Sequence, residues 1–466
     1  MGRGDGGMRY LKEALVGLVA LLALALVLAG VPGLTALQAQ TLAAVLVTLS
    51  LWGTALVPGY AASLLFLTVV IIAGLAAPAE AFSGFSSQAM WLVISGFTIG
   101  EAIRSVGLGT RLAEGLGPRL SHSYPALLGG LMGLCIVLSF LMPSSVGRAV
   151  VMVPVGMALA DRLGFGRGSN GRIGIALIIA FGTHMPGFGV LPGNIPNLVL
   201  AGAAERLYDV RLAYASYLAL HFPVLGLVKA PVIVWLVLRF FPARIEPGAT
   251  PELDTSVRSD PARQRWLVLL LVATLGLWLT DTLHGISPAW IGMAASCIIL
   301  MPRIGFLDGP AFKQAMDFGT LLFIAGALSL GVVVTESGLG PVMAHWLTGI
   351  LPLAQGHDFA NFASLVGLGA VTGIFTTIPG VPAVLTVLAG ELSELTGLPL
   401  DAVIMTQVIG FSTVFFPYQA PPLLVAMGLS GESVKPLLKI LLALAAVSLL
   451  VLTPLAFFWW QLLGWI

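Results

Sequence analysis

The chain has 466 residues, of which 58% are hydrophobic and only 9% charged, with 22 basic and 21 acidic side chains. A soluble domain carries about 25% charged residues, so this composition excludes a cytosolic enzyme, a nucleic-acid-binding protein and a disordered chain. The mean hydropathy of +1.00 indicates an all-helical, polytopic membrane protein in the lipid bilayer. The two cysteines, Cys135 and Cys297, lie in apolar runs and predict neither a disulfide nor a metal site.

The amino-terminal segment carries Arg3, Arg9 and Lys12 ahead of an apolar run over residues 14–28. A cleavable signal peptide has the same order of charge and apolar sequence. We interpret the run as a retained first span with a cytoplasmic amino terminus, because it is long for a signal peptide and many spans follow it.

About 20 apolar residues are needed to cross the bilayer as a helix, and by that ruler we predict about 11 transmembrane helices. Uninterrupted candidates cover residues 14–30, 37–57, 60–76, 214–238, 266–283 and 437–463. Four further stretches are interrupted by proline and glycine, at residues 127–159, 173–202, 362–392 and 402–428. Such interruptions predict broken helices and re-entrant hairpins.

The positions of the basic residues test this topology. If the hairpins near 124–161 and 359–396 enter and leave on the same side, nearly all of the 22 basic residues face one side, which the positive-inside rule makes cytoplasmic. Arg206 and Arg211 fall on the other side, and Arg148 and Lys229 lie within membrane segments. The charges therefore favour re-entrant hairpins in a multi-pass protein of the inner (plasma) membrane.

Ordered features recur in the two halves of the chain. Leu92-Val-Ile-Ser-Gly96 pairs with Leu322-Phe-Ile-Ala-Gly326, and Pro192-x-x-x-Pro196 with Pro417-x-x-x-Pro421. We predict two inverted repeats, each with a hairpin and a broken span, the architecture of secondary transporters. The predicted segments are scaffold helices at 1–80, a first repeat at 81–240 with its broken span at 173–203, a cytoplasmic linker at 241–265, scaffold helices at 266–316, and a second repeat at 317–466 with its broken span at 402–428.

The tip of the first hairpin contains Ser144, Ser145 and Arg148. An arginine inside a membrane is expected to face a cavity or a partner. We predict that Arg148 is a fixed counter-charge for an anion, because its planar fork suits a carboxylate, sulfate or phosphate. The alternative is a structural arginine that caps carbonyl groups at the turn.

The first broken span carries His184, Asn194 and Asn197 among several glycines and prolines. Buried amides are costly unless they are hydrogen-bonded, so both asparagines are predicted to bind the solute. His184 is a candidate for proton coupling, with a hydrogen-bonded structural histidine as the alternative.

In the second half, Thr376 and Thr377 lie at the hairpin tip and Tyr418 and Gln419 in the broken span. These side chains are predicted to complete the solute site. A threonine in a helix also bonds to carbonyl groups of its own helix, so the structural interpretation of each threonine stays open.

The segment Ala81-Phe-Ser-Gly-Phe-Ser-Ser followed by Trp91-Leu-Val-Ile resembles the entry to the fourth span of the divalent anion/sodium symporter family, and the resemblance covers most of the chain. The family's Ser-Asn-Thr-Ala-Thr falls on residues 144–148, where only the first serine is kept. Its Gly-Thr-Pro-Pro-Asn falls on residues 193–197, which keep the glycine, the second proline and the asparagine. The second Ser-Asn-Thr falls near Thr377 with almost nothing kept.

The resemblance implies an elevator-type homodimer with no organic cofactor. It implies sodium ions as the coupling cations, and their ligands would fall on Ser144, Ser145, Gly193 and Thr377. Arg148 stands where the family has a small hydroxyl, and a fixed cation there would replace a sodium ion because Coulomb repulsion disfavours holding both. A sodium-independent exchanger or a proton-coupled carrier is therefore a hypothesis beside the ordinary symporter.

The sequence thus predicts a secondary transporter of small divalent anions, which are di- or tricarboxylates or sulfate, by symport or sodium-independent exchange. The alternative is a carrier of a neutral or other organic solute in the same superfamily, with degenerate ion sites. A membrane-embedded enzyme is not expected, because acidic residues within the spans are scarce and no His-Glu metal motif occurs.

Overall fold

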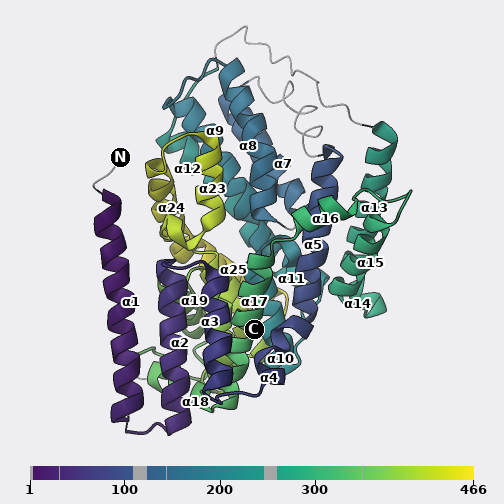
Figure 1. Cartoon of the computed structure of the whole chain (residues 1–466). Helices are drawn as coiled ribbons and strands as arrows, with labels where there is room; N and C mark the ends of the chain where they lie inside the picture. Colours follow the sequence, from purple (N-terminus) through teal and green to yellow (C-terminus); the bar gives the residue numbers. More distant parts are fainter. Residues whose placement is uncertain (1–3, 31, 109–122, 143, 246–259, 349) are drawn as a thin grey trace.

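The computed structural model describes the whole chain except residues 1–3, 31, 109–122, 143, 246–259 and 349. The described part is helical and contains no β-strand. Figure 1 shows long helices running side by side, with α1, α2 and α3 at one edge and α13 and α15 at the opposite one.

The helices of the first half are α1 (Gly4–Ala29), α2 (Ala36–Thr54), α3 (Gly59–Ile72), α4 (Pro78–Ala81), η1 (Ser83–Ser86), α5 (Gln88–Ser105), α7 (Tyr124–Leu141), α8 (Ser145–Arg162), α9 (Asn170–His184), η2 (Pro186–Gly189), η3 (Leu191–Gly193), α10 (Ile195–Tyr208), α11 (Tyr214–Phe222), η4 (Pro223–Val228) and α12 (Lys229–Phe240). The helices of the second half are α13 (Pro261–Leu279), α14 (Asp281–His284), α15 (Pro288–Leu300), α16 (Gly309–Ala315), α17 (Phe318–Glu336), α18 (Leu339–Thr348), α19 (Asp358–Thr376), α20 (Gly380–Leu385), η5 (Thr386–Leu388), α21 (Ala389–Thr396), α22 (Leu400–Phe411), η6 (Pro417–Gln419), α23 (Pro421–Ser430), α24 (Lys435–Val447), η7 (Ser448–Leu452) and α25 (Thr453–Leu462).

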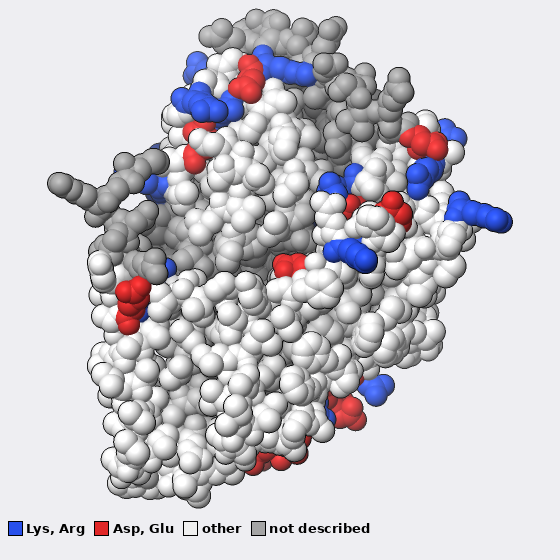
Figure 2. All heavy atoms as spheres, in the orientation of Figure 1, with Lys and Arg blue, Asp and Glu red and all other residues white. Residues whose placement is uncertain are grey.

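Eight helical segments in the described part are long and apolar enough to cross a membrane. Shorter apolar helices, among them α3, α15, α22 and α23, accompany these eight. Figure 2 shows the same property on one face, where charged side chains gather mainly in the upper part, a few more lie along the lower right edge, and a broad area between them carries none. Helix α1 packs on α2 and turns Leu18, Leu21 and Leu22 outward, as expected of a helix that faces lipid.

The first hairpin consists of α7 and α8, and serines cap the helices around it. Ser144 caps α8 by accepting a hydrogen bond from the amide of Gly147 at 3.0 Å, and Ser123 and Ser169 cap α7 and α9 in the same way. These caps satisfy amide groups that have no partner within their helix. The broken span that follows consists of α9, the short turns η2 and η3, and α10.

The second hairpin runs from α19 through a tip at Thr377 to α20, η5 and α21. Thr377 has φ 68° and ψ 164°, a conformation that is costly for a β-branched residue. The broken span of this half consists of α22, η6 and α23. Helices α19 and α22 approach closely, since a Cβ at Gly410 would lie 2.8 Å from the carbonyl oxygen of Val366 and 2.9 Å from the Cα of Gly369.

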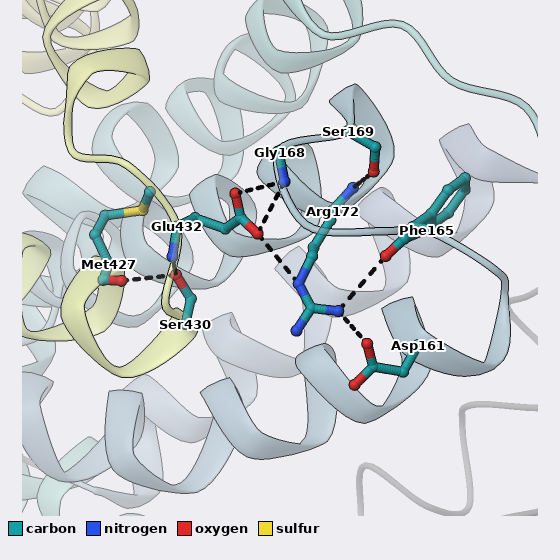
Figure 3. A network of polar contacts seen from close by, with 8 residues as sticks. All are labelled: Asp161, Phe165, Gly168, Ser169, Arg172, Met427, Ser430 and Glu432. Atoms are coloured by element: carbon teal, nitrogen blue, oxygen red, sulfur yellow. Dashed lines mark hydrogen bonds and ion pairs between the residues drawn. The ribbon is translucent and has the colours of Figure 1, made fainter.

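A polar network joins the two halves at the ends of α8, α9 and α23 (Figure 3). Arg172, near the start of α9, pairs with Asp161 in the last turn of α8, and the Arg172 Nε lies 3.1 Å from Oε1 of Glu432. Glu432 also accepts the amide of Gly168, with Oε2 at 3.2 Å. The Arg172 and Glu432 side chains are 7% and 4% exposed, so this ion pair ties the turn between α8 and α9 to the end of α23 away from water.

Candidate solute site

A cavity of about 270 Å³ lies where the hairpin tips approach the broken spans. Ser144 and Ser145 from the first hairpin and Ile378 and Pro379 from the second border it. The broken spans contribute His184, Asn194, Ile195, Pro196, Leu198, Gln419, Ala420, Pro421 and Pro422. Val93, Gly96 and Phe97 of α5 and Thr320 of α17 close the remaining side. Apolar side chains therefore predominate, with a few polar groups converging from separate segments, as is typical of a small-molecule site.

The polar wall of this cavity belongs to the first half. Ser145 Oγ donates to Oδ1 of Asn194 and lies 3.3 Å from Nδ1 of His184. Asn194 Nδ2 donates in turn to the carbonyl oxygen of His184 at 3.0 Å. Contacts among these three residues thus hold their side chains in place. They also bind the tip of the first hairpin to the broken span of the same half.

Arg148 lies behind this wall and is completely buried, with 0% of its surface exposed. Its Nε donates to the carbonyl oxygen of Thr183 at 2.9 Å, its Nη1 to that of Met142, and its Nη2 to that of Gly193 at 3.1 Å. Nη2 also donates to Ser145 Oγ at 3.1 Å. Among the described residues, no carboxylate lies within ion-pair distance of this guanidinium. Its positive charge is therefore balanced only by carbonyl and hydroxyl dipoles.

The fit around Arg148 depends on a glycine in η2. A Cβ at Gly187 would lie only 2.7 Å from Nη2 of Arg148 and 3.0 Å from Nδ2 of Asn194. A side chain at position 187 would therefore push the guanidinium away from its carbonyl acceptors.

Asn197 holds the break of the first half in shape. Its Nδ2 donates to the carbonyl oxygens of Gly187 and Val190, both at 2.9 Å, and the residue is fully buried. These carbonyl groups lie in and beside the short turn η2, and each also accepts one backbone amide, from Val190 and from Gly193. Asn197 therefore gives each of these carbonyl groups a second donor and fastens α10 to the break.

In the second half, Gln419 holds the break in a comparable way. Its Oε1 accepts the amides of Phe415 and Phe416 at 2.9 and 2.8 Å, and its carbonyl oxygen accepts the amide of Ile378 at 3.3 Å. Tyr418 donates through its hydroxyl to the carbonyl oxygen of Ile374 at 2.7 Å. Both residues thus bind the second hairpin tip to the broken span of its half.

The predicted solute-binding residues divide into two groups. Ser144, Ser145, Asn194 and Gln419 line the cavity together with His184. Arg148, Asn197, Thr376, Thr377 and Tyr418 lie outside its described lining. Thr376 bonds through Oγ1 to the carbonyl oxygen of Thr372 at 3.0 Å, which corresponds to the structural interpretation of that threonine.

Sequence reasoning missed the wall formed by α5 and α17. Val93, Gly96 and Phe97 look like ordinary residues of an apolar helix, and only their packing against the hairpin tips places them at the cavity. Lys229 is different, because a lysine within an apolar span is a signal that sequence reasoning noted without assigning it a role.

In the first half, the oxygen atoms predicted to bind sodium already accept hydrogen bonds from protein groups. The carbonyl oxygen of Gly193 and the hydroxyl of Ser145 both accept hydrogen bonds from Arg148, and the hydroxyl of Ser144 accepts the amide of Gly147. A metal ion among these oxygens would lie against the guanidinium, and like charges repel strongly where water is scarce. This set of residues does not fit a sodium ion.

Apolar helices long enough to span a bilayer, two hairpins and two broken helices around a small cavity define a membrane transporter. A sequence profile of the citrate transporter family CitMHS matches residues 44–410, and the chain belongs to this family. It is thus a transporter and not an enzyme, and the resemblance to the divalent anion/sodium symporter group is confirmed.

Individual relatives agree with this assignment, and a solved structure shows a similar fold. The chain is 25% identical over 401 residues to a membrane protein of Cupriavidus necator, covering 83% of this chain and 77% of the relative. It is 22% identical over 440 residues to the sodium-dependent dicarboxylate transporter SdcS of Staphylococcus saprophyticus, covering 87% and 83%. The fold is similar to that of the YdaH transporter of Alcanivorax borkumensis, with a TM-score of 0.55, 19% identity and coverage of 86% and 89%.

Proposed function

We propose that the protein carries small di- or tricarboxylates across the plasma membrane and binds them in the cavity bordered by Ser145, His184 and Asn194. The family and the relative named as a dicarboxylate transporter support a carboxylate substrate. The observation that carries the proposal is the buried guanidinium of Arg148, which has no carboxylate partner among the described residues and donates to Ser145 in the cavity wall. The guanidinium is surrounded by dipoles but has no negative counter-charge among the described residues, and its positive charge favours an anion in the adjoining cavity. Sulfate, which carries two negative charges as a dicarboxylate does, is also proposed as a substrate.

We further propose that the two halves are inverted repeats, that the hairpins and broken spans move together as an elevator, and that the protein acts as a homodimer with a cytoplasmic amino terminus. Each hairpin tip is hydrogen-bonded to the broken span of its own half, through Ser145 in the first and Ile378 in the second. Such contacts favour movement of these elements as one body rather than independent opening of a tip.

Carboxylate binding is proposed to need no sodium ion in the first half, because Arg148 occupies the carbonyl groups that a cation would use. The relative SdcS is named sodium-dependent, so this chain would differ from it in coupling. Exchange of one carboxylate for another then accounts for transport without a sodium gradient. If transport is instead coupled to protons, His184 is the residue proposed to bind the coupled proton.

The test is counterflow in liposomes that contain the purified protein. We expect internal citrate or succinate to drive uptake of labelled substrate equally well in sodium and in potassium buffers. An absolute requirement for sodium in the unmodified protein would refute sodium independence, and absence of carboxylate counterflow under both conditions would refute the carboxylate proposal.

The apolar lining of the cavity favours a second candidate, a carrier of a neutral organic solute. Ser145→Ala distinguishes the two. The control is Ser139→Ala, because the Ser139 hydroxyl bonds within its own helix, to the carbonyl oxygen of Cys135 at 3.0 Å, and Ser139 does not line the described cavity. Ser145→Ala removes the hydroxyl through which Arg148 contacts the cavity wall, and a hydrogen bond to a charged group is worth about 1.5–3 kcal/mol, so carboxylate affinity should fall about 10-fold or more in Ser145→Ala only. Competition by neutral solutes but not by carboxylates would favour the second candidate.

A further inference from the structure

Lys229 is, like Arg148, a cationic side chain that is almost completely buried in the helix bundle. It begins α12, directly after the π-helical turn η4 over Pro223–Val228, and only 1% of its surface is exposed. Turns of this type inside a helix often occur at functional positions. Among the described residues, no carboxylate lies within ion-pair distance of Nζ. The lysine thus lacks the partner that a purely structural buried charge normally has.

The polar partner of Lys229 lies on the broken span of the second half. Nζ donates to the carbonyl oxygen of Ser412 at 2.7 Å and lies 3.4 Å from its hydroxyl. Ser412 is the C-cap residue that directly follows α22. Carbonyl groups at the end of a helix lack partners within the helix and carry partial negative charge. The ammonium therefore occupies the negative end of the first half-helix of this broken span.

Arg148 occupies the corresponding end of the other broken span. Its Nε donates to the carbonyl oxygen of Thr183, in the last turn of α9, and α9 is the first half-helix of that span. Both half-helices therefore end on a buried cationic side chain from a neighbouring element. In transporters with broken helices, unwound carbonyl groups and the carboxyl ends of half-helices are the groups that hold coupling cations.

We propose that Lys229 is a built-in substitute for the coupling cation of the second half, as Arg148 is for the first, so that the protein binds no sodium ion at either broken span. This inference rests on the proposed function and extends it from one half to both. The ammonium supplies the positive charge that the carbonyl end of α22 requires, and it excludes a free cation by repulsion and by occupying the space. The two fixed charges then move with the protein and balance a divalent anion without a cation from solution.

The experiment measures binding of radioactive sodium to the purified full-length protein, without carboxylate, against a constant total of sodium and potassium chloride. We expect the unmodified protein to bind no sodium. Lys229→Met removes the charge while keeping an unbranched apolar side chain, and it should bind one sodium ion per chain. The control is Lys435→Met, because Lys435 is exposed and lies outside the bundle interior, and this variant should bind none.

Three outcomes would overturn the inference. They are sodium binding by the unmodified protein, equal binding by the Lys229 and Lys435 variants, and a folded Lys229→Met protein that binds no sodium. If Lys229→Met is recovered poorly, the yield of folded protein is compared between extraction in sodium chloride and extraction in potassium chloride. A sodium ion that fills the vacated position would stabilise the variant, so the inference predicts a higher yield in sodium chloride, and equal yields would contradict it. Lys229→Arg retains the charge and should behave as the unmodified protein.

Failure of this inference differs from failure of the proposed function, since sodium binding is measured without carboxylate. Sodium bound by a protein that exchanges citrate would remove the role of Lys229 and leave the carboxylate assignment intact. If the Lys229→Met variant gains one sodium ion but the unmodified protein exchanges no carboxylate, the role of Lys229 would stand and the carboxylate assignment would fail.

Discussion

The network around Arg172 allows a prediction in which one arginine is compared with two different carboxylates (Figure 3). The Glu432 side chain is 4% exposed, whereas that of Asp161 is 65% exposed. Solvent screens an exposed pair, so Asp161→Asn should lower the free energy of unfolding by less than about 1 kcal/mol. Removing one partner of a buried pair leaves an uncompensated charge and costs about 3–5 kcal/mol.

We expect Glu432→Gln to cost about 3 kcal/mol, the lower end of that range, because Asp161 still faces the arginine and the amide oxygen still accepts the Gly168 amide. The measurement is reversible unfolding in mixed micelles with increasing denaturing detergent, followed by tryptophan fluorescence. A double-mutant cycle of Glu432→Gln with Arg172→Met isolates the pair, and the double variant should be more stable than the sum of the single costs predicts. Equal costs for Glu432→Gln and Asp161→Asn would refute the reasoning from burial.

Three further substitutions test the hairpin and the breaks. Thr377→Gly should raise the unfolding free energy by about 1 kcal/mol, because glycine adopts the positive φ without strain; a lower melting temperature would contradict this. Gly410→Ala should lower the melting temperature by several degrees, because its Cβ would lie 2.8 Å from the carbonyl oxygen of Val366. The control is Gly428→Ala, whose Cβ would have open space. Equal melting temperatures for the two variants would show that α19 and α22 adjust freely. Asn197→Ala removes the side-chain donor from the carbonyl groups of Gly187 and Val190, which keep only a backbone amide each, and two lost hydrogen bonds should cost about 2 kcal/mol, measured in the same unfolding assay. An unchanged value would mean that water replaces the amide.

The sequence by itself determined the class of the protein. Its scarcity of charged residues is compatible only with a lipid environment. Clusters of proline and glycine marked where the helices break, because proline lacks an amide donor and glycine has a high conformational freedom that disfavours the helix. The breaks lie where the structure has η2, η3 and η6. The serines that precede α7, α8 and α9 are typical helix caps, because a serine hydroxyl accepts an amide in the first turn of the helix.

Only the tertiary structure decided what the polar residues do. Sequence reasoning identified Arg148 as a charge within the membrane, but its acceptors come from Met142, Thr183 and Gly193, which are brought together by the packing of a hairpin against a broken span. Lys229 and Ser412 are 183 residues apart in the chain, and no local pattern predicts their contact. Helix breaks follow from local backbone chemistry, whereas the choice between a solute ligand and an internal cation depends on which carbonyl groups the fold places within reach.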